Sequence, residues 1–143
     1  VQLTPSGSDL SLAVSGSTVG TLLTDRSSGN VGAAGYRGVP MTSITSNYTL
    51  SQPDCGKGLF HDSATAHTVW VPLYASVPIE VGSAIIIHNV VSSGNLTINF
   101  EAGVLLAWAS TGATGARTLA PGGLCTVMRI KDNYWVISGA GLS

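Results

Sequence analysis

The chain has 143 residues, of which 9% are charged and 44% are hydrophobic, and its formal net charge is −1. This balance lacks the basic surface that nucleic-acid binding requires, and no apolar run approaches the roughly 18 residues of a membrane-spanning helix. The first residues, VQLTPSGSDLSL, do not place a basic region before an apolar one, so we expect neither a secretory signal nor membrane insertion.

Glycine is abundant, with 18 residues, and Ser, Thr and Asn take the place of the Lys and Glu that usually cover helices. This composition is typical of β-strands joined by tight turns. Weak charge also means weak self-repulsion, which favours a subunit that associates with copies of itself.

Residues 1–40 differ from the rest of the chain. Alternation at Leu10, Leu12 and Val14 predicts one short strand, and residues 19–23 predict another. The stretch that follows, DRSSGNVGAAGYRGVP, is rich in glycine and buries little by itself. We therefore predict an extended Gly/Ser-rich arm or connector over residues 1–40, packed against another element such as a neighbouring chain.

Residues 41–143 read as a series of short strands separated by turn signals about every 8 to 12 residues. Strands are predicted at 47–50, 59–61, 67–73, 83–91, 96–101, 104–108, 117–119, 124–130 and 134–137. The most apolar run, 83–91, is the expected central strand, residues 92–95 are expected to form a hairpin turn, and residues 131–133 join a closing hairpin. Trp135 in that hairpin is expected in the core.

No segment of ten or more residues shows helical periodicity with helix-forming residues. The predicted fold class is all-β, an antiparallel β-sandwich of about eight short strands over residues 41–143, with the arm preceding it. Jelly-roll connectivity is one option for the strand order.

Several stretches together resemble a known family: GYRGVP (35–40), YTLSQPDCGKGLF (48–60), VWVPLYASVPIEVGSAIIIHNV (69–90) and the ending RTLAPGGLCTVMRIKDNYWVISGAGLS (117–143). They resemble the C-terminal portion of tailed-bacteriophage virion proteins, above all the β-rich ends of tail fibres. The resemblance covers roughly residues 35–143. It implies a virion structural role, a homotrimer and location in the virion after synthesis in the host cytoplasm, and it carries no catalytic signature.

Metal and catalytic chemistry have weak sequence support. His61, His67, His88, Cys55, Asp54 and Asp62 are metal-capable, but they lack compact ligand spacings, so we predict no metal and no cofactor. We expect His88 to donate to a backbone carbonyl. There is no Gly-x-Ser-x-Gly elbow and no clustered carboxylate pair, so we expect no enzyme activity. We expect Cys55 and Cys125 to be free thiols, with a disulfide between them as the alternative.

Aromatic side chains suggest glycan binding, because a ring stacks on the apolar face of a sugar while polar neighbours fix its orientation. The candidates are Trp70, Trp108 and Tyr74, each with a core role as the alternative. Arg26, Arg37 and Tyr36, in the arm, are candidate inter-subunit contacts, because an Arg there can pair with a carbonyl or an acid of a neighbour.

The first hypothesis is a distal tail-fibre-like module that attaches a phage to host-surface glycan as a homotrimer, where avidity multiplies weak sites. Its partners would be itself, other virion proteins and a host glycan. The alternative is a capsid decoration or cement protein whose arm attaches to capsid subunits. A glycan hydrolase tip is a third hypothesis.

Overall fold

A computed structural model describes residues 2–6, 9–14, 17–23 and 38–143. The chain divides into two compact units, Val1–Gly38 and Val39–Ser143. We call them the N-terminal unit and the C-terminal unit.

The N-terminal unit contains three strands, β1 (Gln2–Ser6), β2 (Asp9–Val14) and β3 (Ser17–Leu23), in a sheet of order β1-β2-β3. Both pairs are antiparallel, with Leu3 opposite Leu12 and Leu10 opposite Leu22. The two strands expected in this region correspond to β2 and β3, whereas β1 was not predicted. The glycine-rich part of the predicted arm, 24–37, lies outside the described residues, and so do Arg26, Tyr36 and Arg37.

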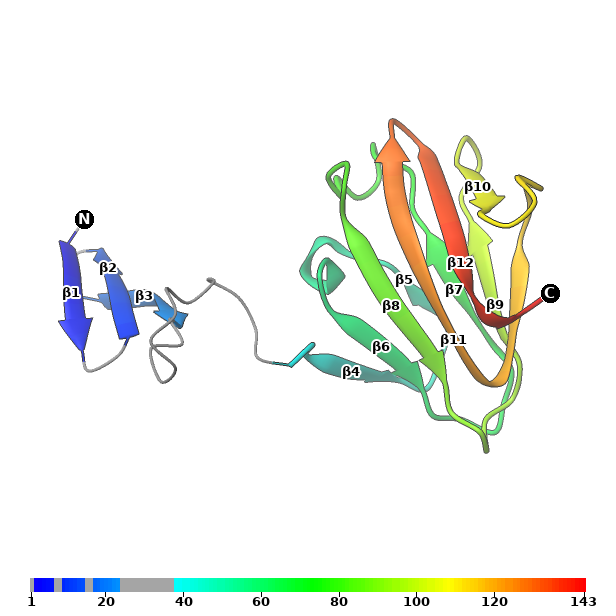
Figure 1. Ribbon diagram of the computed structural model, residues 1–143, viewed down its shortest axis with the longest axis horizontal. Helices are drawn as coiled ribbons and strands as arrows, with labels where there is room; N and C mark the ends of the chain where they lie inside the picture. Colours follow the sequence, from blue (N-terminus) through cyan, green and yellow to red (C-terminus); the bar gives the residue numbers. More distant parts are fainter. Residues whose placement is uncertain (1, 7–8, 15–16, 24–37) are drawn as a thin grey trace. The chain divides into compact units, whose positions relative to one another are not determined.

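The C-terminal unit holds nine strands and one short 3-10 turn, and it confirms the all-β class. Its elements are β4 (Met41–Ile44), β5 (Tyr48–Thr49), η1 (Gln52–Asp54), β6 (Gly58–His61), β7 (His67–Val71), β8 (Ala84–Asn89), β9 (Leu96–Phe100), β10 (Leu105–Trp108), β11 (Arg117–Lys131) and β12 (Tyr134–Leu142). Figure 1 shows these strands curling into one nearly closed, barrel-like sheet.

The curled sheet has two halves, which we call wings, and the chain passes alternately from one to the other. Strands β4, β6 and β8 lie side by side and parallel in one wing, and β5, β7 and β9 do the same in the other. Each circuit of the chain therefore adds one strand to each wing, as in the coils of a β-helix. Parallel neighbours require such a crossover between them, and here the other wing supplies it.

The long strand β11 connects the two wings. Its first residues, 117–119, pair with β9, and residues 124–128 pair with β8, both antiparallel. Between these segments the sequence Ala120-Pro121-Gly122-Gly123 carries an irregularity in the pairing of β11 with β12. The bend lets one strand serve both wings, because a bulge turns the strand and increases its local twist.

The ending of the chain extends the first wing. β12 pairs antiparallel with β11, and β10 pairs parallel with β12, so the first wing has the order β4-β6-β8-β11-β12-β10. Asp132 has a φ of 30°, as expected for the polar turn 131–133. Gly139 allows β11 and β12 to approach closely, because a Cβ there would lie 2.2 Å from the carbonyl oxygen of Leu124.

The core lies between the inner faces of the two wings. Ile85, Ile87 and Val127 of one wing and Val69 and Ile98 of the other are fully buried in a single cluster. Trp135 is also buried in it, as predicted. Apolar residues alternate with outward ones along each strand, and this period of two is what places the core inside the curl.

Two sequence predictions about topology are wrong. Five of the eight strand pairs in the C-terminal unit are parallel, where antiparallel pairing was expected. Residues 92–95 do not form a hairpin turn, because β8 and β9 lie in different wings. Short loops suggested hairpins, but here they cross between wings. The sandwich with jelly-roll connectivity is not confirmed.

Candidate binding surfaces

The outer face of β5, β7 and β9 presents an uncharged polar surface around one tryptophan. In the strand register, Thr49, Trp70 and Asn99 form one row, and Thr68, Thr97 and Thr118 form the next. We call this surface the Trp70 face and define it by those six residues. The inner positions of the same strands, Val69 and Ile98, are fully buried, so the six residues point away from the core.

Polar groups on the Trp70 face remain available to a ligand. Asn99 Oδ1 accepts a hydrogen bond from the backbone N–H of Phe100 at 2.9 Å, which leaves the NH₂ group of Asn99 to donate to a ligand. The indole N–H of Trp70 and the hydroxyls of Thr68 and Thr97 form no hydrogen bond within residues 38–143, and none of them is sealed from solvent.

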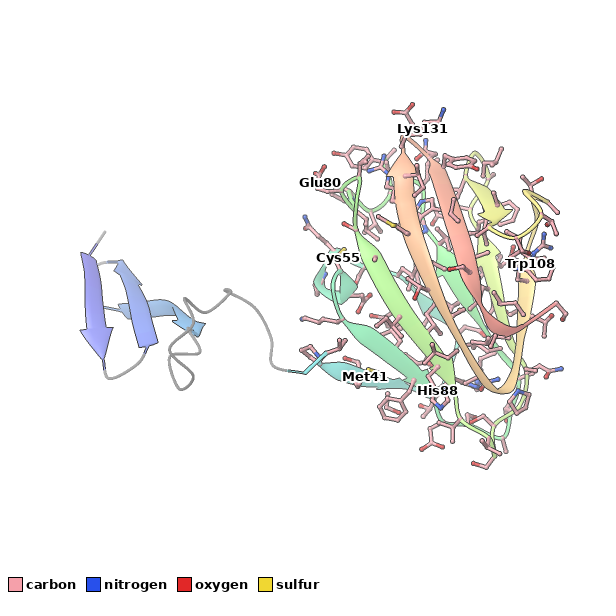
Figure 2. All side chains as sticks on the ribbon, in the orientation of Figure 1. Met41, Cys55, Glu80, His88, Trp108 and Lys131 are labelled. Carbon is pink, nitrogen blue, oxygen red and sulfur yellow. The ribbon has the colours of Figure 1, made fainter. Side chains whose placement is uncertain are left out.

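Trp108, the second glycan candidate, already has a partner on its ring. The Arg117 guanidinium carbon lies 5.2 Å from the ring centroid, within cation–π range. Arg117 also donates to the carbonyls of Ala113 and Ala116, which fixes the loop after β10. Figure 2 shows Trp108 at the sheet edge away from Met41. At least one face of the Trp108 ring is therefore covered by a contact within the fold.

Tyr74, the third candidate, is exposed but is likewise occupied on one face. The guanidinium carbon of the buried Arg129 lies 4.3 Å from its ring centroid. Arg129 donates to the carbonyls of Ile79 and Asp132, so it ties the β11–β12 turn to the loop before β8. Of the three aromatic candidates predicted from the sequence, Trp108 and Tyr74 therefore each have an arginine over the ring.

A buried polar chain that sequence reasoning missed runs through His61, Asn89 and His67. Asn89 Nδ2 donates to the carbonyls of Leu119 and Gly94 at 2.8 and 3.0 Å, so Asn89 Oδ1 faces His61 Nδ1, 2.8 Å away. His61 Nδ1 must then carry a proton. His61 Nε2 lies 2.9 Å from His67 Nδ1, and in the neutral pair it accepts from His67.

This buried polar chain joins the four strands β6, β7, β8 and β11 and the loop at Gly94 across the inside of the unit. His61 and Asn89 are fully buried, and burial without partners would be costly for both. The sequence separation of 28 residues explains why no local pattern indicated the contact. Within residues 38–143, no three His, Cys, Asp or Glu side chains gather as metal ligands. His88 Nδ1 lies 3.0 Å from the carbonyl of Gly123, as predicted.

The carboxylate of Asp54 is committed to local structure. It accepts from the Tyr48 hydroxyl at 3.1 Å and from the Ser51 backbone and hydroxyl at 2.7 Å, which caps the 3-10 turn η1. Burial raises the pKa of Tyr48 above its ordinary value, and the Asp54 charge adds to this against the Ser51 hydrogen bond. This is a fold-stabilising cluster.

Both cysteines are free, and Cys125 is buried. Burial raises the pKa of Cys125 to about 12. Because the thiolate is the reactive form, this thiol is chemically inert in the folded protein.

The outer face of the first wing carries several large apolar side chains, among which the register also places Ser43, His88, Thr126 and Ser138. Met41, Leu124, Met128 and Ile130 expose 47%, 50%, 39% and 42% of their surface. The register places Phe60, Ile86 and Val136 among them on β6, β8 and β12. We call this surface the apolar outer face and define it by Met41, Phe60, Ile86, Leu124, Met128, Ile130 and Val136. Apart from Lys131 at the turn, its outward strand positions carry no Lys, Arg, Asp or Glu.

None of the described residues forms a helix with the length and hydropathy needed to span a membrane. No protein-family model, curated protein or solved structure matches this chain.

Proposed function

We propose that this chain is a structural module of a phage virion that self-associates, as a homotrimer, through the apolar outer face and attaches to host-surface glycan. The apolar outer face is the observation that supports the proposal. A monomer rarely leaves several large apolar side chains exposed on one uncharged sheet face, and such patches mark interaction sites. Copies of the chain suit it as partners because the face offers no charge for an oppositely charged protein to pair with.

The free energy gained by burying these side chains is comparable to the cost of association. Full burial of a Leu, Ile or Met side chain contributes about 1.5–3 kcal/mol, so each of the four half-exposed side chains contributes roughly 1 kcal/mol. In a trimer twelve such side chains, four from each copy, would contribute roughly 12 kcal/mol, against the estimated 4–15 kcal/mol that each association step must offset. The contribution of Phe60, Ile86 and Val136 would add to it.

The test is the oligomeric state of the full chain by light scattering at micromolar concentration. The wild type is expected to have three times the chain mass, and Met128→Lys is expected to dissociate it while circular dichroism stays unchanged. Val91→Lys is the matched control, because Val91 is 78% exposed but lies outside the apolar outer face. A monomeric wild type, or a Met128→Lys trimer, would contradict the proposal.

A capsid decoration protein is the second candidate. The separate N-terminal unit favours it, because a small independent unit can anchor a chain to another virion protein. Imaging of intact particles with this chain labelled separates the two: label on an appendage supports the fibre-like module, and label over the shell supports decoration. Label absent from purified particles would refute both.

A further inference from the structure

We propose that the Trp70 face binds a neutral glycan, with Trp70 as the stacking platform. This inference rests on the proposed attachment role and gives it a site and a ligand class. It selects Trp70 from the three aromatic candidates and adds the other five residues of the Trp70 face as ligand contacts.

The selection follows from what already occupies each ring. The guanidinium groups of Arg117 and Arg129 lie over Trp108 and Tyr74, and Trp135 is in the core. Trp70 has no cation over its ring within residues 38–143. A half-buried indole that points outward from a sheet is fixed in place yet accessible, which lowers the entropy lost when a ligand stacks on it.

The neighbours of Trp70 determine the ligand class. Thr49 and Asn99 flank it in the same row, and a row of three threonines lies beside it. Strand neighbours are about 5 Å apart and successive outward rows about 7 Å apart, so the face extends over a span that suits two linked sugar rings. Its donors and acceptors are hydroxyl, amide and indole N–H groups.

The ligand should be uncharged because the face has no group to pair with a charge. All six residues of the Trp70 face are neutral, and burying an acidic sugar against them would leave its carboxylate unpaired, which is costly. A neutral sugar instead places its C–H face on the indole and exchanges water for threonine hydroxyls. A single such site is expected to be weak, and the proposed trimer would multiply it.

The test uses the full chain and the three indole N–H signals that its three tryptophans give in a nitrogen–proton correlation spectrum. The probes are the neutral tetrasaccharides of glucose (α1,4 and β1,4), mannose, galactose and N-acetylglucosamine, with sialyllactose and tetragalacturonate as acidic comparisons. Trp70→Phe identifies the Trp70 signal. At least one neutral probe is expected to shift that signal in a saturable way, while the Trp135 signal stays unchanged.

Three variants make the test specific. Trp70→Ala is expected to lower affinity at least tenfold and Thr97→Val, which removes one hydroxyl at constant shape, several-fold. Trp108→Ala should leave affinity within twofold. The inference is overturned if no neutral probe binds at millimolar concentration, if the acidic probes bind more tightly, or if Trp70→Ala binds like the wild type.

Failure of this inference can be told apart from failure of the proposed function. If the purified chain blocks phage adsorption and Trp70→Ala blocks it equally, attachment stands and the Trp70 site falls. If neutral glycan binds through Trp70 but labelled chain is absent from particles, the site stands and the virion role falls.

Discussion

Replacement of Asn89 by Leu should remove a large part of the stability of the C-terminal unit. The Asn89 amide makes three hydrogen bonds of 2.8, 2.8 and 3.0 Å, to His61 and to the carbonyls of Leu119 and Gly94. Leucine has a similar size, so the substitution removes the bonds with little change of packing volume. His61 and Leu119 are fully buried and would lose a partner that water does not replace.

The magnitude follows from those two orphaned groups. Each buried polar group left without a partner costs about 1–3 kcal/mol, so the expected loss in the free energy of unfolding is about 4 kcal/mol. A typical domain has only about 5–15 kcal/mol in total. The variant should therefore unfold at a far lower urea concentration than the wild type.

The assay is urea unfolding followed by tryptophan fluorescence, since the buried Trp135 reports the core, at one fixed protein concentration. Asn95→Ala is the control, because Asn95 is exposed and its change is expected to stay within about 0.5 kcal/mol. A loss below about 1 kcal/mol for Asn89→Leu would refute the reasoning, because the buried polar chain would then contribute little to folding.

Three further predictions concern other parts of the C-terminal unit. Gly139→Ala should destabilise it by about 3 kcal/mol in the same urea assay, because the added Cβ meets the backbone of Leu124. The control is Gly38→Ala, at the last residue of the N-terminal unit, where the added Cβ has open space and should be neutral; equal effects would contradict the close approach of β11 and β12. Iodoacetamide at pH 8 should modify Cys55, which is partly exposed, and spare Cys125 until the chain is unfolded, as mass spectrometry would show; rapid double modification of folded protein would count against the buried thiol. Folding raises the pKa of Tyr48, so the contribution of this residue to the free energy of unfolding is fully present below pH 10 and is lost as the pH rises further. The free energy of unfolding should therefore fall more steeply above pH 10 in the wild type than in Tyr48→Phe, and parallel curves would contradict this prediction.

The sequence was sufficient to locate strands but not to pair them. The continuous apolar run 83–91 predicted β8 as an interior strand, and alternation of apolar and polar residues placed Leu96 and Ile98 inward on β9; both predictions are confirmed. The same alternation arises in parallel and antiparallel neighbours. Only the path of the loops distinguishes the two, and residues 62–66 or 90–95 look the same whether they return the chain to its neighbour or carry it to the opposite wing.

The sequence identified the candidate site residues one by one, but it did not predict the contacts that they make in the fold. Trp70, Trp108 and Tyr74 are all aromatic residues in short strands or loops, and their sequence contexts do not differ in kind. What separates them is the approach of Arg117 to Trp108 and of Arg129 to Tyr74. The second contact spans 55 positions and depends on the tertiary fold, so no local pattern could have predicted it.

The bridging role of β11 has a consequence for how the protein is made. Among the described strands, no hydrogen-bonded pair links the β4-β6-β8 group to the β5-β7-β9 group except through β11, which begins at Arg117. Synthesis proceeds from the N-terminal end at roughly 5–20 residues per second, so β11 emerges after every strand of the two groups that it connects. For several seconds during synthesis, the two groups of strands therefore expose apolar inner faces that other polypeptides could contact. A stop codon that removes β11 and β12 would leave the two groups without a connecting strand, and the core would not close.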